Sequence, residues 1–342
     1  MQQKITILSI NADLYPMYYQ LVQSSKWGNP MLPIMYNNKL WGCVVCAGNT
    51  IIGGWVGILR GDIPLARILT KSVYFDAYPI FINKQHEKEY LDTLIDAITT
   101  QAQKDRIVMI NLTHWVREQN MEVDQQEKNA TFITPLQTTE TDLWAKVESK
   151  QRNCIRKGEK SGVEVIVSKG TDSLSYLDAF QLLRQRTQQH AIKNNAQASM
   201  LLKSNMFFSE LFQNPNSTLL VAKVEDKVAA VALMLQSGNT VYYYSGGSDY
   251  ELNKKYSCSA YLIWKAILYF NEQGIRWFDM GGVPVQPTKE HPAYGVYAFK
   301  RSFGGDYQEC EGGKIVINNW KYNILKLILS QQKILRLFSK KL

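Results

Sequence analysis

Apolar runs of strand length alternate with polar turns in the first half of the chain. The runs at 40–47 and 50–59 flank Gly48-Asn49, a pattern that predicts a β-hairpin. Apolar residues at helical spacing predict a long helix over 87–104 with one buried face. The other elements expected in this half are a strand at 5–10, a helix at 13–24, a short strand at 73–75 and a buried strand at 106–112.

The second half repeats this order of elements. A hairpin is expected where Glu225-Asp226-Lys227 separates two apolar runs, and Gly274 ends a long apolar helix. The expected strands lie at 163–167, 218–224, 228–235, 240–244 and 276–280, and the expected helices at 174–190, 205–213 and 257–273.

Each half therefore contains helices, antiparallel strands, a long helix and a final strand. This is the element order of the Gcn5-related N-acetyltransferase (GNAT) fold, and its repetition suggests an old duplication. We predict an α+β protein with mixed sheets flanked by helices, in two tandem GNAT-like domains. The threonine-rich stretch around Pro135 divides the chain into domain 1 at 1–137 and domain 2 at 138–317, and we expect 318–342 to be a C-terminal helix.

Composition agrees with a globular protein of two domains. The chain has 342 residues, of which 45% are hydrophobic and 20% charged, and its net charge of +9 favours anionic partners. Five scattered cysteines argue against a disulfide framework, and the Cys43/Cys46 pair lies in an apolar run typical of a buried strand. We find no metal-ligand spacing, so no metal is expected.

The two ends of the chain bear on its location. The N-terminus lacks the apolar core of a signal peptide, and no apolar run is long enough to span a bilayer. We therefore expect a reducing, cytoplasmic protein. The tail at 319–342 has the composition of an amphipathic basic helix, which either lies on the inner face of an anionic membrane or packs back on domain 1.

A basic helix is expected at 143–162. The candidate phosphate- or tRNA-binding residues on it are Arg152, Arg156, Lys157 and Lys160. Several of them recur at spacings of three and four, so they share a helical face, and guanidinium groups pair well with phosphate oxygens. The alternative is a solvated linker helix.

The segment from Trp277 to Gly305 is the main candidate site. A buried strand ends in Asp279-Met280-Gly281-Gly282, and Lys300 and Arg301 then lie between two phenylalanines. Charges held between apolar anchors, beside glycines that permit close backbone approach, are typical of a ligand site. The candidate substrate-binding residues are Phe299, Arg301, Phe303, Tyr244, Gly281 and Gly282. The alternative is a strand, a surface loop and a short amphipathic helix.

Three motifs resemble the FemABX family of non-ribosomal peptidyltransferases. They are Lys150-x-Arg152-x-x-Ile155-Arg156-Lys157-x-x-Lys160-x-Gly162-Val163, Phe278-Asp279-x-Gly281-Gly282 and Phe299-Lys300-x-x-Phe303-Gly304-Gly305. The resemblance implies two GNAT-like domains and transfer of an amino acid from aminoacyl-tRNA to an amine on a cell-wall precursor. It also implies that Lys300 stabilises charge at the reacting centre. The chain lacks the coiled-coil insertion of some members, and the residues that contact the acceptor cannot be placed by motif.

Acyl transfer to an amine needs a stabilised oxyanion and a route for the amine proton. Lys300 suits the first task, and Asp279 suits the second, unless its carboxylate only bonds to its own loop. The segment 245–256 lacks the glycine spacing with which GNAT enzymes cradle coenzyme A, and Asp249 and Glu251 would repel a pyrophosphate. We therefore expect no tightly bound cofactor, and aminoacyl-tRNA or acyl-CoA as co-substrate.

The leading hypothesis is an aminoacyl- or acyltransferase that acts on a peptidoglycan precursor or a lipid-linked glycan. A second hypothesis is a coenzyme A-dependent N-acyltransferase that modifies an amino sugar during surface-polysaccharide synthesis. A third is a non-catalytic protein that binds RNA or a membrane through the basic helix and the tail. The oligomeric state is left open.

Overall fold

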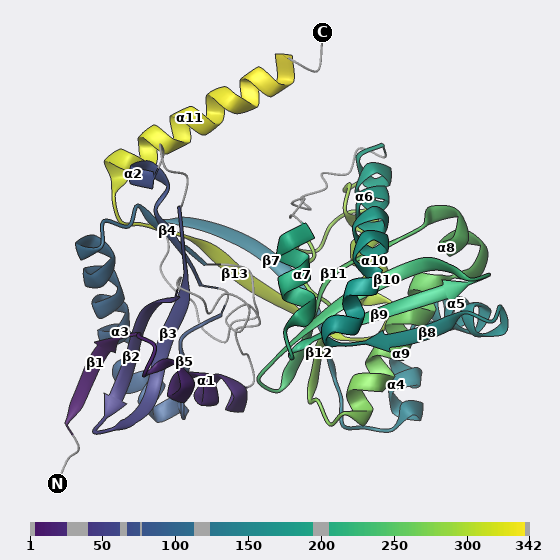
Figure 1. Ribbon diagram of the computed structural model, residues 1–342, viewed down its shortest axis with the longest axis horizontal. Helices are drawn as coiled ribbons and strands as arrows, with labels where there is room; N and C mark the ends of the chain where they lie inside the picture. The colour runs from purple at the N-terminus through teal and green to yellow at the C-terminus, as the bar shows by residue number, and fades with distance from the viewer. Residues whose placement is uncertain are drawn as a thin grey trace. The chain divides into compact units, whose positions relative to one another are not determined.

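A computed structural model describes residues 4–25, 40–61, 67–75, 77–112, 124–193 and 205–338 (Figure 1). The chain forms two compact units, of which unit 1 comprises Met1–Lys128 with Glu311–Leu342, and unit 2 comprises Asn129–Cys310. Strands β7 (Gln125–Pro135) and β13 (Asp306–Val316) each contribute residues to both units. The division expected at 137/138 falls just after β7, whereas the compact units divide within this strand.

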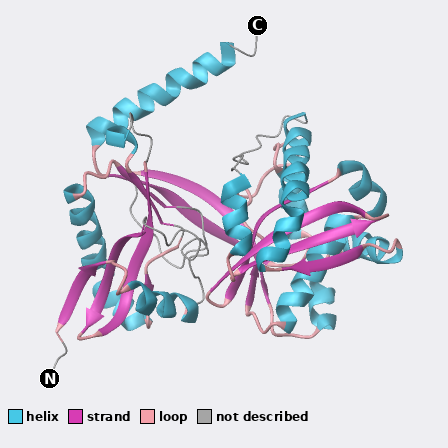
Figure 2. Cartoon of the chain, in the orientation of Figure 1, coloured by secondary structure: helices cyan, strands magenta, loops and turns pink. Residues whose placement is uncertain are grey.

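Unit 1 is a sheet with helices on both faces (Figure 2). Its sheet order is β1-β2-β3-β4-β6-β13, and β5 pairs with β3. Helix α3 packs on one face through Leu94 and Ile98, and α1 packs on the other through Tyr18 and Val22. The elements are β1 (Ile5–Ser9), α1 (Tyr15–Ser24), β2 (Leu40–Ala47), β3 (Thr50–Arg60), α2 (Arg67–Thr70), β4 (Ser72–Phe75), β5 (Ile80–Phe81), α3 (Lys84–Lys104), β6 (Met109–Leu112) and α11 (Asn319–Phe338).

Unit 2 has a sheet of order β7-β12-β11-β10-β9-β8. Helix α9 packs on one face, where Ile263 and Ile267 meet Ala232 and Phe278. The elements are α4 (Glu140–Lys146), α5 (Ser149–Lys160), β8 (Glu164–Ser168), the 3-10 helix η1 (Gly170–Tyr176), α6 (Leu177–Lys193), α7 (Asn205–Gln213), β9 (Ser217–Val224), β10 (Lys227–Ser237), β11 (Thr240–Ser248), α8 (Tyr250–Tyr256), α9 (Cys258–Glu272), β12 (Trp277–Asp279) and α10 (Tyr294–Arg301).

The parallel strands β11 and β12 separate after a short contact. They pair only from Thr240 and Trp277 to Tyr242 and Asp279, and then β12 ends while β11 continues to Ser248. The register of β11 against β10 shifts at Tyr244, which is a β-bulge. The candidate site lies where the pairing of β11 with β12 ends.

Most of the predicted elements are present. Both hairpins and the long helices begin and end within a few residues of the prediction, and the buried strand predicted at 106–112 covers only Met109–Leu112. The prediction missed β7 and β13, and the polar stretch expected to be a boundary contains the end of β7 instead. Polar and charged residues interrupt the apolar pattern of both strands, and β13 also contains two glycines, so periodicity did not predict either strand.

The C-terminal helix α11 belongs to unit 1 and contacts α2. Within the residues that the structure describes, no helix has the length and apolar character needed to cross a membrane.

Candidate functional site

Asp279 is a buried carboxylate at the end of β12. Its side chain is 1% exposed, and its Oδ1 accepts a hydrogen bond of 2.7 Å from the backbone N–H of Gly281 and another from the hydroxyl of Thr131 on β7. Burial raises the pKa of Asp279, and these two hydrogen bonds and the nearby Lys300 oppose that rise. The carboxylate thus fixes the turn that follows β12.

Gly281 makes this turn possible. Its φ is +73°, and a Cβ atom there would lie 2.7 Å from the backbone oxygen of Tyr243. Only glycine adopts this conformation so close to a neighbouring strand without strain. As a result the chain passes tightly beside β11, and the carbonyl of Gly282 is available to Lys300.

Lys300 approaches the same turn from α10. Its Nζ donates a hydrogen bond of 3.1 Å to the oxygen of Gly282 and lies 5.6 Å from the ring centroid of Tyr243. Burial lowers the pKa of Lys300 to about 8, against the opposing effect of the Asp279 charge. An ammonium has three N–H donors. Gly282 takes one of them, and no second acceptor is found among the described residues, so two N–H groups are left for an oxygen of a substrate.

The two tyrosines of β11 have different positions at this site. Tyr243 is half-buried beneath Lys300, and burial raises the pKa of its phenol to about 12, so it stays neutral. Tyr244, the predicted substrate-binding residue, is half-buried at the bulge, where the strand changes which face its side chains occupy. The ring that contacts Lys300 therefore belongs to the neighbour of the predicted tyrosine.

The predicted phenylalanines anchor α10. Phe299 packs against Phe303 with ring centroids 5.2 Å apart, and Phe303 lies in the core of unit 2. Gly304 has a φ of +79°, and a Cβ there would lie 2.2 Å from the backbone oxygen of Lys146, so only glycine permits this approach to the end of α4. These positions hold Lys300 in place; for Phe303, burial gives a packing role rather than contact with a substrate.

Arg301 follows Lys300 on α10 and lines a pocket. Its Nε forms an ion pair of 2.9 Å with Glu148, which precedes α5. The pocket has a volume of about 490 Å³. It is lined by Gln286, Pro287, Thr288, Lys289, Tyr294, Tyr297, Arg301 and Tyr307.

The basic residues of α5 are not gathered into one cluster. Arg152 donates to the backbone oxygen of Trp144 at 3.4 Å, and Arg156 lies over the Trp144 ring at 5.2 Å. Lys157 donates to the backbone oxygen of Lys254 at 3.2 Å, and Lys160 is exposed. Within the described chain, no hydrogen bond or ion pair joins these four residues to the Asp279–Lys300 cluster.

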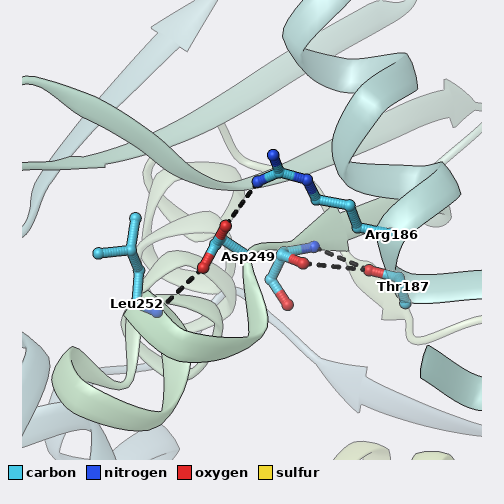
Figure 3. A network of polar contacts seen from close by, with 5 residues as sticks. Arg186, Thr187, Asp249 and Leu252 are labelled. Carbon is cyan, nitrogen blue, oxygen red and sulfur yellow. Dashed lines mark hydrogen bonds and ion pairs between the residues drawn. The ribbon is translucent and has the colours of Figure 1, made fainter. Parts of the chain in front are cut away.

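The segment between β11 and α9 is closed by its own side chains (Figure 3). Asp249 precedes α8, and its carboxylate accepts a hydrogen bond of 3.1 Å from the N–H of Leu252. The same carboxylate forms an ion pair of 2.7 Å with Arg186 of α6. At the start of α9, Asn253 Oδ1 accepts from the N–H of Ser259 at 2.8 Å. One backbone N–H group at each of these helix starts is therefore already bonded and is not available to a phosphate.

The five cysteines, all within the described ranges, form no disulfide. Cys258 opens α9 but is fully buried, and burial raises its pKa to about 11, so its thiol is protonated and unsuited to nucleophilic attack. Cys43 and Cys46 lie buried on β2.

The structure brings together Asp279, Gly281, Gly282 and Lys300, which come from two of the motifs. The sequence reasoning missed Thr131 and Tyr243. Thr131 lies on the unpredicted strand β7 and is 148 residues from Asp279, so no local pattern could have paired them. Tyr243 stands in the run Val241-Tyr242-Tyr243-Tyr244, where the bulge decides which ring faces Lys300.

The match to a known family lies within unit 2. Residues 145–301, which include Asp279 and Lys300, match the family model of the acetyltransferase (GNAT) domain. Over 98 residues the chain is 29% identical to lipid II:glycine glycyltransferases from two strains of Staphylococcus epidermidis. This match covers 28% of the chain and 23% of the relatives, so the chain matches less than two thirds of their length.

Solved structures resemble the whole chain in fold. A crystal structure of FemX has a TM-score of 0.70 at 15% identity, over 93% of this chain and 99% of that one. A tandem GNAT protein from the clavulanic acid biosynthesis pathway has a TM-score of 0.51 at 9% identity, over 92% of this chain and 99% of that one. The predicted α+β fold with two tandem GNAT-like domains is thereby confirmed.

Proposed function

We propose that this chain belongs to the FemABX family and transfers an aminoacyl or acyl group to an amine of a cell-envelope precursor. Its motifs, its partial match to lipid II:glycine glycyltransferases and its fold support this proposal. The observation that carries the proposal is the ammonium of Lys300, held where the pairing of β11 with β12 ends, with two N–H groups available to a substrate. The partial match to lipid II:glycine glycyltransferases favours a peptidoglycan precursor as the acceptor.

In the proposed reaction, the amine of the acceptor attacks the acyl carbon of the donor. A carbon–nitrogen bond forms, and the carbonyl oxygen becomes an oxyanion. When the oxyanion collapses, the bond from the acyl carbon to the donor oxygen breaks, and the amine proton passes to that departing oxygen. Lys300 donates an N–H to the oxyanion or to the departing oxygen. A cation of this kind is worth more in a site that excludes water. Asp279 orients the Gly281–Gly282 turn and holds Lys300 in its charged form, which makes it a positioning residue that need not touch the amine.

Aminoacyl-tRNA is the preferred donor in this proposal. Asp249 and Asn253 each occupy one of the backbone N–H groups with which a helix start could bind the pyrophosphate of coenzyme A, and the carboxylate of Asp249 would repel that pyrophosphate. Lys157 and Lys160, on the solvent side of α5, supply positive charge for an RNA backbone, and Arg156 supplies more beside Trp144.

Thermal stability with each donor tests this choice. A non-hydrolysable analogue of charged tRNA should raise the melting temperature of the protein, and acetyl-CoA should not, since a ligand that binds the folded state stabilises it. Strong stabilisation by acetyl-CoA, with none from charged tRNA, would instead support the coenzyme A-dependent N-acyltransferase that the GNAT domain match also favours.

We also propose that α11 brings unit 1 to an anionic membrane surface. Trp320 and Leu327 are 69% and 61% exposed on α11, and Ile68 on the neighbouring α2 is 70% exposed. Glu311 is the last acidic residue of the given sequence, so every charged residue of α11 is basic. Such a helix suits the headgroup region of anionic lipid, where a lipid-linked acceptor would lie.

A further inference from the structure

A guanidinium is buried in unit 2 without a carboxylate partner. Arg184 lies on α6, where its backbone packs against Gly247 of β11, and it is only 3% exposed. Its Nε donates to the hydroxyl of Ser245 at 2.8 Å, and its Nη1 donates to the side-chain oxygen of Gln181 at 3.0 Å. Both partners are neutral, and no ion pair to Arg184 is found within the described ranges. Since arginine is almost never fully buried unless it is paired with an acid, the absence of a carboxylate here requires an explanation.

Two aromatic rings cover this guanidinium. The Cζ of Arg184 lies 4.4 Å from the ring centroid of Phe208 and 5.4 Å from that of Phe180, and both rings are fully buried. The rings stabilise the cation through their faces but supply no hydrogen-bond acceptor.

Most of the donors of Arg184 are unused. A guanidinium has five N–H groups, of which two are bonded here, so three have no acceptor among the residues that the structure describes. The Nη2 atom of Arg184 is not among the polar atoms that are both fully buried and unbonded, so it is open to a ligand. A buried cation with three unused donors is therefore available to an anion from outside the chain.

Arg184 and Lys300 meet the same short stretch of β11. Ser245, the partner of Arg184, follows the bulge residue Tyr244, and Tyr243, whose ring lies under Lys300, precedes it. Because a strand rises about 3.3 Å per residue, the Cα atoms of Tyr243 and Ser245 are at most about 7 Å apart. Burial lowers the pKa of Arg184, an effect that Tyr244 opposes, and the guanidinium stays charged. Two cations thus flank three consecutive residues at the candidate site.

The chemistry of Arg184 favours a carboxylate over a phosphate. A carboxylate is planar, carries a single negative charge and accepts two parallel N–H groups from one guanidinium. A phosphate carries more charge than one arginine neutralises. The next arginine of α6, Arg186, is already paired with Asp249 at 2.7 Å (Figure 3). One guanidinium between two apolar rings is therefore matched by one carboxylate.

We propose that Arg184 binds a free carboxylate of the acceptor, so that the chain selects acceptors in which a carboxylate accompanies the reacting amine. The inference rests on the proposed function and adds a specificity-determining residue to it. The acceptor is the substrate that supplies this group, because the carboxyl carbon of the donor is itself the reacting centre and is not a free carboxylate. Lys300 acts on the acyl carbonyl, and Arg184 positions the amine that attacks it.

Calorimetric titration of the full chain with matched probes tests this role. Nα-acetyl-L-lysine carries a primary amine and a free carboxylate, and Nα-acetyl-L-lysine amide differs from it only at the carboxylate. We expect the acid to bind the unchanged protein about tenfold more tightly than the amide or better, since hydrogen bonds between two charged groups are the strong ones. Inorganic phosphate, the third probe, should bind more weakly than the acid.

Three variants assign the preference to Arg184. Arg184→Met keeps an unbranched side chain against the two phenylalanines but removes the guanidinium, so the acid and the amide should then bind about equally. Arg184→Lys keeps the charge without two parallel N–H groups and should retain only part of the preference; it carries the test if Arg184→Met does not fold. Arg186→Met is the matched control, because Arg186 lies on the same helix with its side chain 50% exposed, and it should keep the full preference.

The proposal is overturned if the acid and the amide bind the unchanged protein equally or not at all, or if phosphate binds as tightly as the acid. It is also overturned if Arg184→Met, or Arg184→Lys in its place, keeps the full preference. If the preference is found and depends on Arg184 but no group is transferred from any donor, the proposed function fails and the carboxylate site stands.

A transfer assay separates the opposite case. With a peptide acceptor that has a free carboxylate, Arg184→Met should raise KM and leave kcat nearly unchanged, whereas with the amidated peptide it should change neither. If transfer occurs but free and amidated acceptors react alike in both proteins, the proposed function stands and this inference fails.

Discussion

Lys300 is a cation in surroundings that solvate a charge poorly. The carbonyl of Gly282, the ring of Tyr243 and the buried charge of Asp279 replace the water that the ammonium loses, but they leave its pKa near 8, well below the ordinary value for lysine. A residue that is costly to bury and still present is commonly one that serves the chemistry.

Because burial of the Lys300 ammonium is unfavourable, we predict that Lys300→Met stabilises the protein and removes its activity. The folded-state pKa lies below the unfolded one, so burial of the ammonium destabilises the native state below about pH 8, and this effect fades as the pH rises toward 10.5. At pH 7 we expect Lys300→Met to raise the free energy of unfolding by on the order of 1 kcal/mol in urea titrations. The matched change is Lys169→Met, whose exposed ammonium also lies over a tyrosine ring and should shift stability by less than about 0.5 kcal/mol. Equal or lower stability of Lys300→Met at pH 7 would contradict this account.

Asp279→Asn separates a positioning role from a role as general base. If Lys300 acts as a cation, the rate of the wild-type protein falls as the pH rises through about 8. The amide can still accept from Thr131 and Gly281 but carries no charge, so the pKa of Lys300 should drop and the alkaline limb should move to lower pH by up to about one unit. The rate at pH 6.5 should remain within about tenfold of wild type. A loss of about a hundredfold or more at every pH would instead identify Asp279 as the base that takes the amine proton.

At the scale of the elements, glycines allow the backbone of a strand to lie directly against the backbone of a helix. Gly247 on β11 lies against α6, and a Cβ there would be 2.5 Å from the backbone of Leu183 and Arg184. Gly247→Ala should therefore destabilise the protein by roughly 2–4 kcal/mol in denaturant titrations, because two backbones must move apart.

Gly295→Ala is the matched control for this change. Gly295 lies in α10, and a Cβ there would have no neighbouring atom within 4 Å, so alanine should be neutral or stabilise the helix by up to about 1 kcal/mol. Similar unfolding midpoints for the two alanine variants would show that α6 and β11 do not constrain each other as described.

Periodicity predicted the elements whose two faces differ clearly. The hairpin β2–β3 and the helices α3 and α9 have continuous apolar runs or faces, and each is close to its predicted bounds. Strands β7 and β13 mix polar and apolar residues without a regular period, so neither was predicted. Thr131, the partner of Asp279, lies on β7 and was missed for the same reason. The motif located Lys300 and the glycine turn, but which tyrosine lies under Lys300 depends on a bulge, which only the pairing of β10 with β11 reveals.

For the molecule as a whole, the proposed membrane contact is an electrostatic one and can be separated from catalysis. Replacing Lys321 and Lys326 of α11 by glutamate should weaken binding to vesicles rich in phosphatidylglycerol at least tenfold, since each basic residue near the surface contributes about 1 kcal/mol. Co-sedimentation with the full chain measures this, and zwitterionic vesicles should bind little of either protein. The same reversal at Lys169 and Lys265 in unit 2 is the control. Unchanged sedimentation of the α11 variant would leave α11 as a packing element of unit 1.

The most direct test of the central claim is transfer itself. Total tRNA charged with labelled amino acids is incubated with a lipid-linked or nucleotide-linked peptidoglycan precursor and the full chain. We expect the wild-type protein and Lys169→Ala to move label to the precursor at equal rates, and Lys300→Ala to be slower by about a hundredfold or more. Transfer by Lys300→Ala at the wild-type rate would contradict the role of Lys300, and labelling of the precursor from acetyl-CoA but not from tRNA would contradict the proposed donor.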